Sequence, residues 1–249
     1  MKVLALIPAR YDASRFPGKL MAPLRGVPVI RHTYAAVVDT GLFDEVMVAT
    51  DSPAIYDEII RHGGRAFMSR RRHETGSDRI AEAAASLDAD IVLNVQGDEP
   101  FTRREPLEKL LAVFNAPGAE QIDVASLMQE MHRQPQIDDP NFVKVAVDGQ
   151  GFALLFSRAP IPHPFATNIR PVYYEHIGIY AFRKQALLDF ADTPATPLER
   201  AEKIECLRYL EMGKKIKMVV TDYMGVEIDT PDDLHNAEKL LDNMSNSNK

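Results

Sequence analysis

Three cationic side chains stand close together near the start of the chain, in a pattern that can bind phosphate. Arg10, Arg15 and Lys19 lie in one loop that follows the apolar run 3–7. In open α/β sheets, ligands bind outside the carboxyl ends of the strands, which is where a loop after the first strand lies. Arginine grips phosphate oxygens with its fork and lysine adds a point charge. The loop therefore indicates a polyphosphate site; the plain alternative is a solvated loop whose charges pair with nearby acids.

Two aspartates far apart in the sequence offer a second kind of chemistry. Asp98 follows the apolar run 90–95 in a Gln-Gly-Asp turn, and Asp229 stands directly before Thr230 and Pro231. Magnesium in proteins prefers one or two carboxylates together with substrate phosphates, so this pair is a candidate metal site. For Asp229 the local sequence favours a plainer role, in which it and Thr230 begin and cap the last helix.

The segments that must position these side chains are of two alternating kinds. Short apolar runs typical of buried strands are followed by longer stretches with one apolar helical face, the pattern of β-α-β units. The clearest predicted strands are residues 3–7, 45–50 and 90–95, and the predicted helices are residues 27–39, 53–62 and 77–87. The alternation predicts an α/β fold with a mainly parallel sheet flanked by helices.

After about residue 120 the pattern changes to that of a smaller, mixed α/β subdomain. The run Asp148-Gly-Gln-Gly151 between two apolar stretches is a strong hairpin signal. We expect strands at 143–147, 152–157, 173–182 and 215–221, a charged helix over 198–212 that ends before Gly213, and a last helix that begins at 230–233. No linker divides the sequence, so a single domain over residues 1–249 is predicted.

Composition excludes several classes of function. The chain has 249 residues and a formal net charge of −7, which argues against the nucleic-acid backbone or an anionic membrane surface as main partner. Its one cysteine, Cys206, rules out an intrachain disulfide framework and suits a reducing compartment. No stretch approaches the ~20 apolar residues of a membrane span. The cytoplasm is therefore the predicted location.

The basic loop also lacks the fingerprints of two common nucleotide-binding folds. Gly18-Lys19 is followed by Leu20 rather than by serine or threonine, so the loop is not a Walker motif. The chain has no G-x-G-x-x-G after its first strand either, which speaks against a dehydrogenase.

Eight segments taken together resemble one family. They are the loop Pro8 to Lys19, Ala49-Thr-Asp51, His73 to Arg79, Asn94 to Pro100, Phe156-Ser-Arg158, His176 to Tyr180, Pro197-Leu-Glu199 and Ile228 to Pro231. In this order, over roughly residues 2 to 242, they resemble the 3-deoxy-manno-octulosonate (Kdo) cytidylyltransferases. These are nucleotidyltransferases with a Rossmann-like, GT-A-type sheet and a sugar-binding subdomain.

The resemblance implies a reaction and its partners. The anomeric hydroxyl of Kdo, an acidic 2-oxo sugar, attacks the α-phosphorus of CTP to give CMP-Kdo and pyrophosphate for lipopolysaccharide biosynthesis. Magnesium is the implied cofactor, and the implied assembly is a homodimer. Residues 1–120 would mainly bind CTP, residues 121–225 would mainly bind the sugar and form the dimer, and residues 226–249 would return to the metal site and end in a helix and tail.

Individual residues take their roles from the resemblance. The catalytic residues would be Arg10, Lys19, Asp98 and Asp229. The nucleotide would be bound by Pro8, Ala9, Arg10, Arg15, Lys19, Thr75, Gly76, Ser77, Arg79, Gln96, Gly97 and Asp98. The sugar would be bound by Gln96, Arg158, His176, Tyr180, Glu202 and Glu205, and the metal by Asp98 and Asp229. Cations in the first loop would neutralise the charge that grows on the leaving pyrophosphate.

Some of these residues also have plainer readings. Ser77 can cap the helix that follows it. His176 and Tyr180 are four apart on a predicted strand and share one face, as half-buried sheet residues do. Glu202 and Glu205 are three apart on the predicted helix 198–212, on a face that is usually solvated.

The chain departs from the family's usual pattern at a few points. Cys206 stands where the family usually has glutamine, Leu20 where it usually has proline, and Asp12 and Ala13 replace smaller or hydroxyl residues. The segment 161–172, in the region of the family's dimer contact, is shorter than in many members. These departures leave the sugar and the dimer open rather than the nucleotide chemistry.

Three other functions compete with this hypothesis. An 8-amino variant of Kdo is an alternative acceptor. A sialic acid cytidylyltransferase shares the fold and reaction, but its first loop typically runs Ala-Arg-x-Gly-Ser-Lys-Gly, unlike residues 10–15 here. A non-catalytic nucleotide-binding regulator would be expected to have lost a charged site residue, whereas Lys19, Asp98 and Asp229 are all present.

Overall fold

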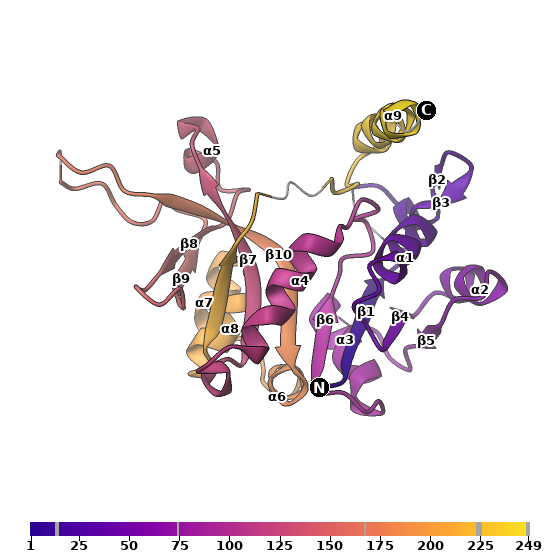
Figure 1. The fold of residues 1–249 in the computed structure, drawn as a ribbon, viewed down its shortest axis with the longest axis horizontal. Coiled ribbons are helices and arrows are strands. Elements are labelled where there is room, and N and C mark those ends of the chain that lie inside the picture. The colour runs from indigo at the N-terminus through magenta and orange to yellow at the C-terminus, as the bar shows by residue number, and fades with distance from the viewer. Residues whose placement is uncertain (13–14, 74, 167, 223–225, 248–249) are drawn as a thin grey trace. The chain divides into compact units, whose positions relative to one another are not determined.

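The computed structural model describes the chain except for residues 13–14, 74, 167, 223–225 and 248–249 (Figure 1). Ala13, and Glu74 of the segment from His73 to Arg79, therefore lie outside the described residues. The chain forms two compact units. Unit 1 consists of Met1–Arg104 and Met224–Lys249, and unit 2 of Glu105–Tyr223.

Unit 1 is built on a parallel sheet, as the sequence predicts. Its strands, in the order in which they pair, are β6 (Ile91–Asn94), β1 (Val3–Ala9), β4 (Glu45–Thr50) and β5 (Ala66–Met68). Every residue of β1 is buried. An unbroken apolar run is what a central strand covered on both faces requires. β1 continues through Pro8 and Ala9, so the basic loop starts at the carboxyl edge of the sheet.

The helices of unit 1 follow its strands. They are α1 (Val29–Asp39), α2 (Pro53–Arg61), α3 (Gly76–Ala85) and α9 (Pro231–Ser247), with the short 3-10 helix η1 (Lys19–Met21) before the small hairpin β2 (Pro23–Leu24) and β3 (Val27–Pro28). The predicted helix 27–39 begins only at Val29, because Val27 and Pro28 form β3 and pair with β2. The cap of α3 is Thr75, whose side chain accepts from the Asp78 amide at 3.0 Å. Ser77 lies inside the first turn and does not cap the helix.

Unit 2 has a mixed sheet, also as expected. Its strands are β7 (Val124–Met131), β8 (Lys144–Val147), β9 (Ala153–Ser157), β10 (Tyr173–Arg183) and β11 (Ile216–Val220). β10 runs antiparallel to β7 and β8, β8 forms a hairpin with β9, and β11 runs parallel to β7. The predicted turn is confirmed: a carboxylate oxygen of Asp148 accepts from the amides of Gln150 and Phe152.

The helices of unit 2 include α4, which the sequence placed in the nucleotide-binding half. They are α4 (Arg104–Ala112), α5 (Gln134–Asp138), α6 (Lys184–Asp192), α7 (Pro197–Glu202) and α8 (Cys206–Glu211), with 3-10 helices η2 (Val113–Asn115) and η3 (Ala119–Gln121). All of α4 except its first residue belongs to unit 2. The expected boundary at residue 225 lies outside the described residues. Within the described chain, every helix is too short or too polar to cross a membrane.

The predicted single helix over 198–212 is wrong. The segment forms α7 and α8, which are separated at Lys203, a residue in the left-handed conformation with φ 56° and ψ 46°. A left-handed residue ends an α-helix because it turns the next amide away from the ladder. Tertiary contacts hold this break, since Arg158 donates from Nε to the Glu202 carbonyl at 2.6 Å and from Nη2 to the Lys203 carbonyl at 3.4 Å.

Candidate active site

Unit 1 brings three of the predicted catalytic residues together. Lys19 Nζ lies 2.5 Å from Asp98 Oδ2 and 2.7 Å from Asp229 Oδ1. Asp229 Oδ2 also accepts from Arg15 Nη2 at 2.6 Å. Burial alone would lower the pKa of Lys19, but its carboxylate partners outweigh that effect and raise the pKa. The Lys19 ammonium therefore stays charged, between two carboxylates that are more than a hundred residues apart in sequence.

The Asp229 carboxylate does not cap the last helix, α9. Thr230 Oγ1 accepts from the Asp233 amide at 3.2 Å, and Asp233 Oδ2 accepts from the amides of Asp229 and Thr230. Thr230 and Asp233 thus cap α9 between them, which leaves the Asp229 carboxylate to pair with the cations. The backbone amide of Ile228 donates to the Asp98 carbonyl at 3.0 Å, and this bond joins the two acidic segments.

A third carboxylate, which the sequence analysis missed, lies at the same place. Single oxygen atoms of Asp98, Glu227 and Asp229 lie within 4.8 Å of one another. Loss of water around the carboxyl group, and next the negative charges of Asp98 and Asp229, raise the pKa of Glu227 to about 7. Other parts of the residue are exposed to solvent. Oxygen donors of this kind suit Mg²⁺, and the Lys19 ammonium shows that two of them already hold a cation. The residues present fit the implied metal.

Two glycines let the segments of the site approach one another. A Cβ atom on Gly97 would lie 3.0 Å from the Pro8 carbonyl oxygen, and one on Gly76 would lie 3.2 Å from Pro8 Cγ and 3.9 Å from Gln96 Oε1. Any side chain at Gly97 would push β1 away from the turn after β6. The two glycines therefore hold the end of β1, the start of α3 and the turn before Asp98 together.

Arg79, predicted to bind nucleotide, anchors the end of β1. It is 4% exposed, donates to the Ala9 carbonyl at 3.2 Å and pairs with Asp51 at 2.7 Å. Hydrogen bonds from Arg79 lower the pKa of Asp51, which therefore remains a carboxylate. The segment Ala49-Thr-Asp51 supports the family resemblance, yet its motif gave no role for Asp51. The structure shows that this residue fixes Arg79.

A cavity of about 460 Å³ opens beside this ion pair. Its lining residues are Arg10, Tyr11, Asp12, Asp51, Ser52, Arg72, His73 and Arg79. The volume lies in the range of small-molecule sites, and the mixture of guanidinium groups and carboxylates can meet both phosphate and polar base edges. Arg10 and Arg79 come from the predicted set, whereas Arg72 and Tyr11 do not.

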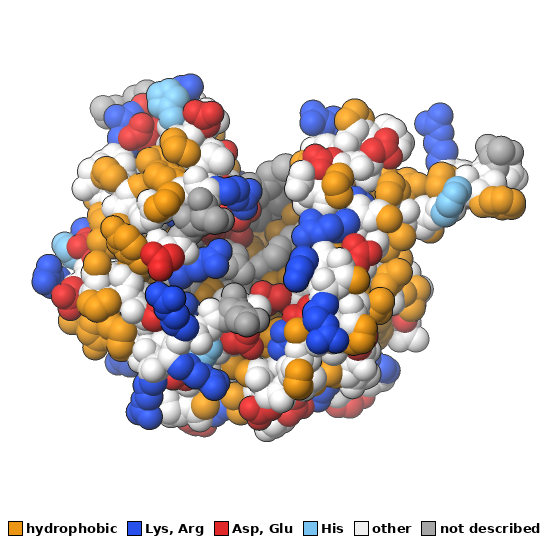
Figure 2. Space-filling view, turned by 180° about the vertical axis from the view of Figure 1, so that it is seen from behind, with side chains coloured by type: hydrophobic (Ala, Val, Ile, Leu, Met, Phe, Trp, Pro, Cys, Tyr) orange, Lys and Arg blue, Asp and Glu red, His pale blue; other side chains and the backbone are white. Residues whose placement is uncertain are grey.

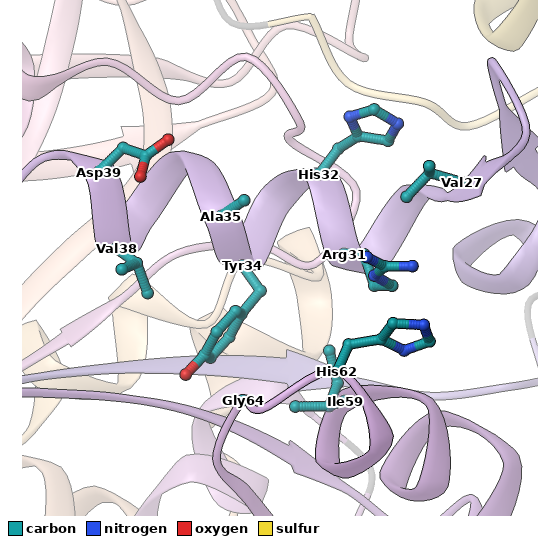
Figure 3. A pocket seen from close by; sticks show the side chains of 10 residues that line it. All are labelled: Val27, Arg31, His32, Tyr34, Ala35, Val38, Asp39, Ile59, His62 and Gly64. Atoms are coloured by element: carbon teal, nitrogen blue, oxygen red, sulfur yellow. The ribbon is translucent and has the colours of Figure 1, made fainter.

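Another cavity of unit 1, of about 300 Å³, lies beside α1 and α2 (Figure 3). Arg31 and His62 line it, and both already have partners. Arg31 lies 3.6 Å from the Glu58 carboxylate, and His62 Nδ1 lies 2.8 Å from the Glu58 carbonyl oxygen. None of the residues that the sequence assigns to a site lines this cavity. The cavity beside Arg79 is therefore the stronger candidate for a nucleotide.

Unit 2 brings together a second group of predicted residues. His176 and Tyr180 both face Cys206: Tyr180 Oη lies 3.0 Å from the sulfur and His176 Nε2 lies 3.8 Å from it. Ile177 pairs with Leu127 and Tyr180 with Ser126, so β10 takes three steps where β7 takes one. β10 thus gains two residues relative to β7. Because two is an even number, His176 and Tyr180 still lie on the same face of the sheet, as predicted.

The three groups at this face are neutral at physiological pH. Burial lowers the pKa of His176 to about 4 and raises that of Cys206 to about 12, and it also raises the pKa of Tyr180. His176 keeps some exposed surface, but its ring packs against the rings of Phe156 and Tyr180. The cluster offers uncharged donors and acceptors, which are suited to hydroxyl groups rather than to a phosphate.

His176 makes stability depend on pH. Its pKa is lower in the folded protein than in the unfolded chain, so the unfolded chain binds the proton first and stability falls as pH drops below about 6.5. Between pH 8 and pH 5 the native protein should lose up to about 2 kcal/mol more unfolding free energy than a His176→Gln variant. Urea unfolding at the two pH values measures this difference. Equal losses in both proteins would show that the histidine is protonated in the folded state.

Arg158 and Glu202 lie together in unit 2, where both bind groups of the protein itself. Besides the bonds at the α7–α8 break, Arg158 Nη1 donates to the Pro140 carbonyl at 2.8 Å. The Glu202 carboxylate accepts from the Ser157 hydroxyl at 2.8 Å and from the Arg158 amide at 3.0 Å. Because the helix breaks at Lys203, Glu202 ends α7 and Glu205 precedes α8, so the two glutamates do not share one helical face.

Comparison with known proteins adds an independent line of evidence. The model of the cytidylyltransferase family matches residues 4–216. A 3-deoxy-manno-octulosonate cytidylyltransferase of Flavobacterium johnsoniae is 57% identical, over 97% of this chain and 99% of that relative. One of Christiangramia forsetii is 58% identical, over 96% and 97%. A solved structure of CMP:2-keto-3-deoxy-manno-octonic acid synthetase complexed with CTP superposes with a TM-score of 0.91 and 36% identity, covering 98% of this chain and 100% of that one.

The match to the family model runs through both units and includes seven of the eight segments on which the resemblance rests. The alignments with the two relatives cover 97% and 96% of the chain. The geometry agrees with them, because the charged centre at Lys19 and the cavity beside Arg79 are built from those same segments. This chain belongs to the cytidylyltransferase family, in the group of the 3-deoxy-manno-octulosonate cytidylyltransferases.

Proposed function

We propose that this protein transfers the cytidylyl group of CTP to Kdo and releases pyrophosphate. The observation that carries the proposal is the centre of Lys19, Asp98 and Asp229, in which two carboxylates and a cation from distant segments meet at the carboxyl edge of a parallel sheet. In the transfer, a bond forms between the anomeric oxygen of Kdo and the α-phosphorus, and the bond from that phosphorus to pyrophosphate breaks. Pyrophosphate leaves with the electron pair of the broken bond, and the hydroxyl proton passes to solvent water as the new bond forms.

The cations of unit 1 would carry the electrostatic part of the reaction. Lys19 and Arg15 pair with carboxylates in the structure, and phosphate oxygens can accept the same charge-assisted hydrogen bonds. Binding of the triphosphate would turn them toward the β- and γ-phosphates, where they neutralise the charge that grows on the leaving group. Asp98 and Asp229 would hold Mg²⁺, which supplies further neutralisation of the phosphate charge when bound.

The neutral face of unit 2 would recognise the acceptor. His176 and Tyr180 offer hydrogen bonds to sugar hydroxyls, and Arg158 has the fork geometry that suits a carboxylate. Cys206, which closes this face, is the residue at which the chain departs from the family's usual glutamine. The 8-amino analogue of Kdo is therefore the acceptor to compare with Kdo.

The assay that tests the proposal is pyrophosphate release from each of the four nucleoside triphosphates, with Kdo, its 8-amino analogue and sialic acid as acceptors. Release with CTP and Kdo, well above that with every other pair, is the expected result. Preference for the 8-amino analogue or for sialic acid would change the acceptor and keep the chemistry. Nucleotide binding without release from any pair would instead favour a regulator.

We also propose that the protein acts as a cytoplasmic homodimer that supplies lipopolysaccharide synthesis. Support for the dimer comes from the described residues 158–166 and 168–172 of unit 2, which project as an arm (Figures 1 and 2). It exposes large apolar side chains, with Phe165 at 91%, Ile169 at 62% and Val172 at 50%. Apolar groups so exposed are typical of association surfaces. Light scattering should give twice the mass of the 27.9 kDa chain; a single-chain mass would contradict the dimer.

A further inference from the structure

We propose that Glu227 is a third carboxylate ligand at the cation site of Asp98 and Asp229, and that the site therefore binds a divalent cation before the nucleotide arrives. The inference rests on the proposed function, which assigns the cation to the two aspartates. Glu227 belongs to neither the predicted set nor the segment Ile228 to Pro231 that supports the family resemblance.

The path of the chain places Glu227 beside Asp229. Ile228 is fully buried, and its amide bonds to the Asp98 carbonyl at 3.0 Å. Glu227 and Asp229 stand on either side of this buried isoleucine in the sequence. Oxygens of Glu227, Asp229 and Asp98 accordingly converge within 4.8 Å.

A fourth acidic side chain, that of Glu99, lies close by; burial, and next the charges of Asp98 and Glu227, raise its pKa to about 8, so it adds no charge at neutral pH. Glu99 is 8% exposed, and its Oε2 atom has no hydrogen-bond partner among the described residues. It lies close enough to interact electrostatically with both Asp98 and Glu227. A buried polar atom without a partner requires an explanation, such as an ion at the site.

The cations that now balance the aspartates are the ones that the triphosphate needs. Lys19 and Arg15 form their ion pairs with Asp98 and Asp229. In the nucleotide-free protein these two positive charges face three converging carboxylates. One negative charge is then left over, and like charges this close repel one another unless a further cation compensates them. A divalent cation is the compensation that fits oxygen donors at this spacing.

The number of carboxylates decides when the cation binds. With one or two carboxylates, Mg²⁺ relies on substrate phosphates to complete its coordination. A third carboxylate adds an anionic ligand that is present without substrate. We therefore expect the nucleotide-free protein to bind Mn²⁺, the spectroscopic substitute for Mg²⁺, at one site that Mg²⁺ can displace.

The experiment is a titration of the full-length, nucleotide-free protein with Mn²⁺, in which free Mn²⁺ is measured by electron paramagnetic resonance. Glu227→Gln should weaken Mn²⁺ binding at least tenfold, and Glu227→Asp, which keeps the charge on a shorter side chain, should weaken it less. Glu238→Gln on α9 removes one glutamate charge elsewhere in unit 1 and should leave the affinity unchanged. Thermal melts of each variant establish that it is folded.

The outcomes separate this inference from the proposed function. If Glu227→Gln and the unmodified protein bind Mn²⁺ equally well, or if the unmodified protein binds none without CTP, the inference is overturned, even where CMP-Kdo is formed normally. If Mn²⁺ binding depends on Glu227 but no CMP-Kdo is made, the cation site stands and the proposed function falls. Should Glu227→Gln fail to fold, the comparison of Glu227→Asp with Glu238→Gln decides.

Discussion

Asp98→Asn is expected to reduce turnover with CTP and Kdo by about three orders of magnitude or more while the protein stays folded. The amide is nearly the same size as the carboxylate but carries no charge, so it neither holds a divalent cation nor balances Lys19. Asp229→Asn should have an effect of the same order. Steady-state pyrophosphate release measures both, and urea unfolding should show a loss of only about 1–2 kcal/mol, since Lys19 keeps one of its two partners.

A matched control comes from the opposite edge of the same sheet. Asp90 accepts a hydrogen bond from the Lys2 amide at 2.6 Å and stands before β6, at the amino end of the strands. Asp90→Asn removes one aspartate charge from unit 1 and should leave turnover within about twofold, because it touches no part of the site. A well-folded Asp98→Asn protein with near-normal turnover would refute the assigned role.

Arg158→Lys should lower kcat/KM for Kdo by roughly ten- to a hundredfold, with little change in the Kd for CTP. Lysine keeps the charge but loses the planar fork, and in the structure that fork spans carbonyls from two segments, at Pro140 and Glu202. The variant thus loses both the geometry for a sugar carboxylate and the contacts that hold the α7–α8 break. Initial rates over a range of Kdo concentrations give the first quantity, and calorimetry with CTP gives the second.

Arg183 provides the comparison that separates these two losses. It also holds carbonyls in unit 2, with Nε 2.8 Å from the Ile122 oxygen and Nη2 2.6 Å from the Ala119 oxygen. Arg183→Lys should destabilise the protein by a similar amount without changing kcat/KM for Kdo. If both variants lose activity in proportion to their loss of stability, Arg158 is a structural residue and another cation binds the carboxylate. Weaker CTP binding in Arg158→Lys would instead show that Arg158 serves the nucleotide.

The elements that the sequence predicted well are those whose signal is local. An unbroken apolar run such as β1 has few alternatives to a buried strand, and the turn at Asp148 is decided by its own glycines. The first loop and Asp98 were placed correctly at the carboxyl edge of the sheet because that follows from the order of strands and helices. The fold class was predictable for the same reason, whereas the cytidylyl transfer was implied by the resemblance to the family.

The features that were missed depend on contacts between distant segments. Lys203 has no local reason to adopt a left-handed conformation; Arg158 binds the carbonyls of Glu202 and Lys203 at this point, and no periodicity reveals such a contact. Glu227 follows a valine and precedes an isoleucine, as a solvent-facing residue of any exposed strand would. Its position beside Asp98 became visible only when the backbone bond from Ile228 was known.

The division of unit 1 into two stretches of sequence has a consequence for the synthesis of the protein. Residues 1–104 leave the ribosome first, then the whole of unit 2, and only afterwards the stretch that carries Glu227, Asp229 and α9. A nascent chain can pair Lys19 with Asp98 but has no complete cation site until Asp229 has been translated. A chain whose translation stops within unit 2 therefore has the basic loop and Asp98 but lacks Glu227 and Asp229, so Arg15 has lost its carboxylate partner and Lys19 one of its two.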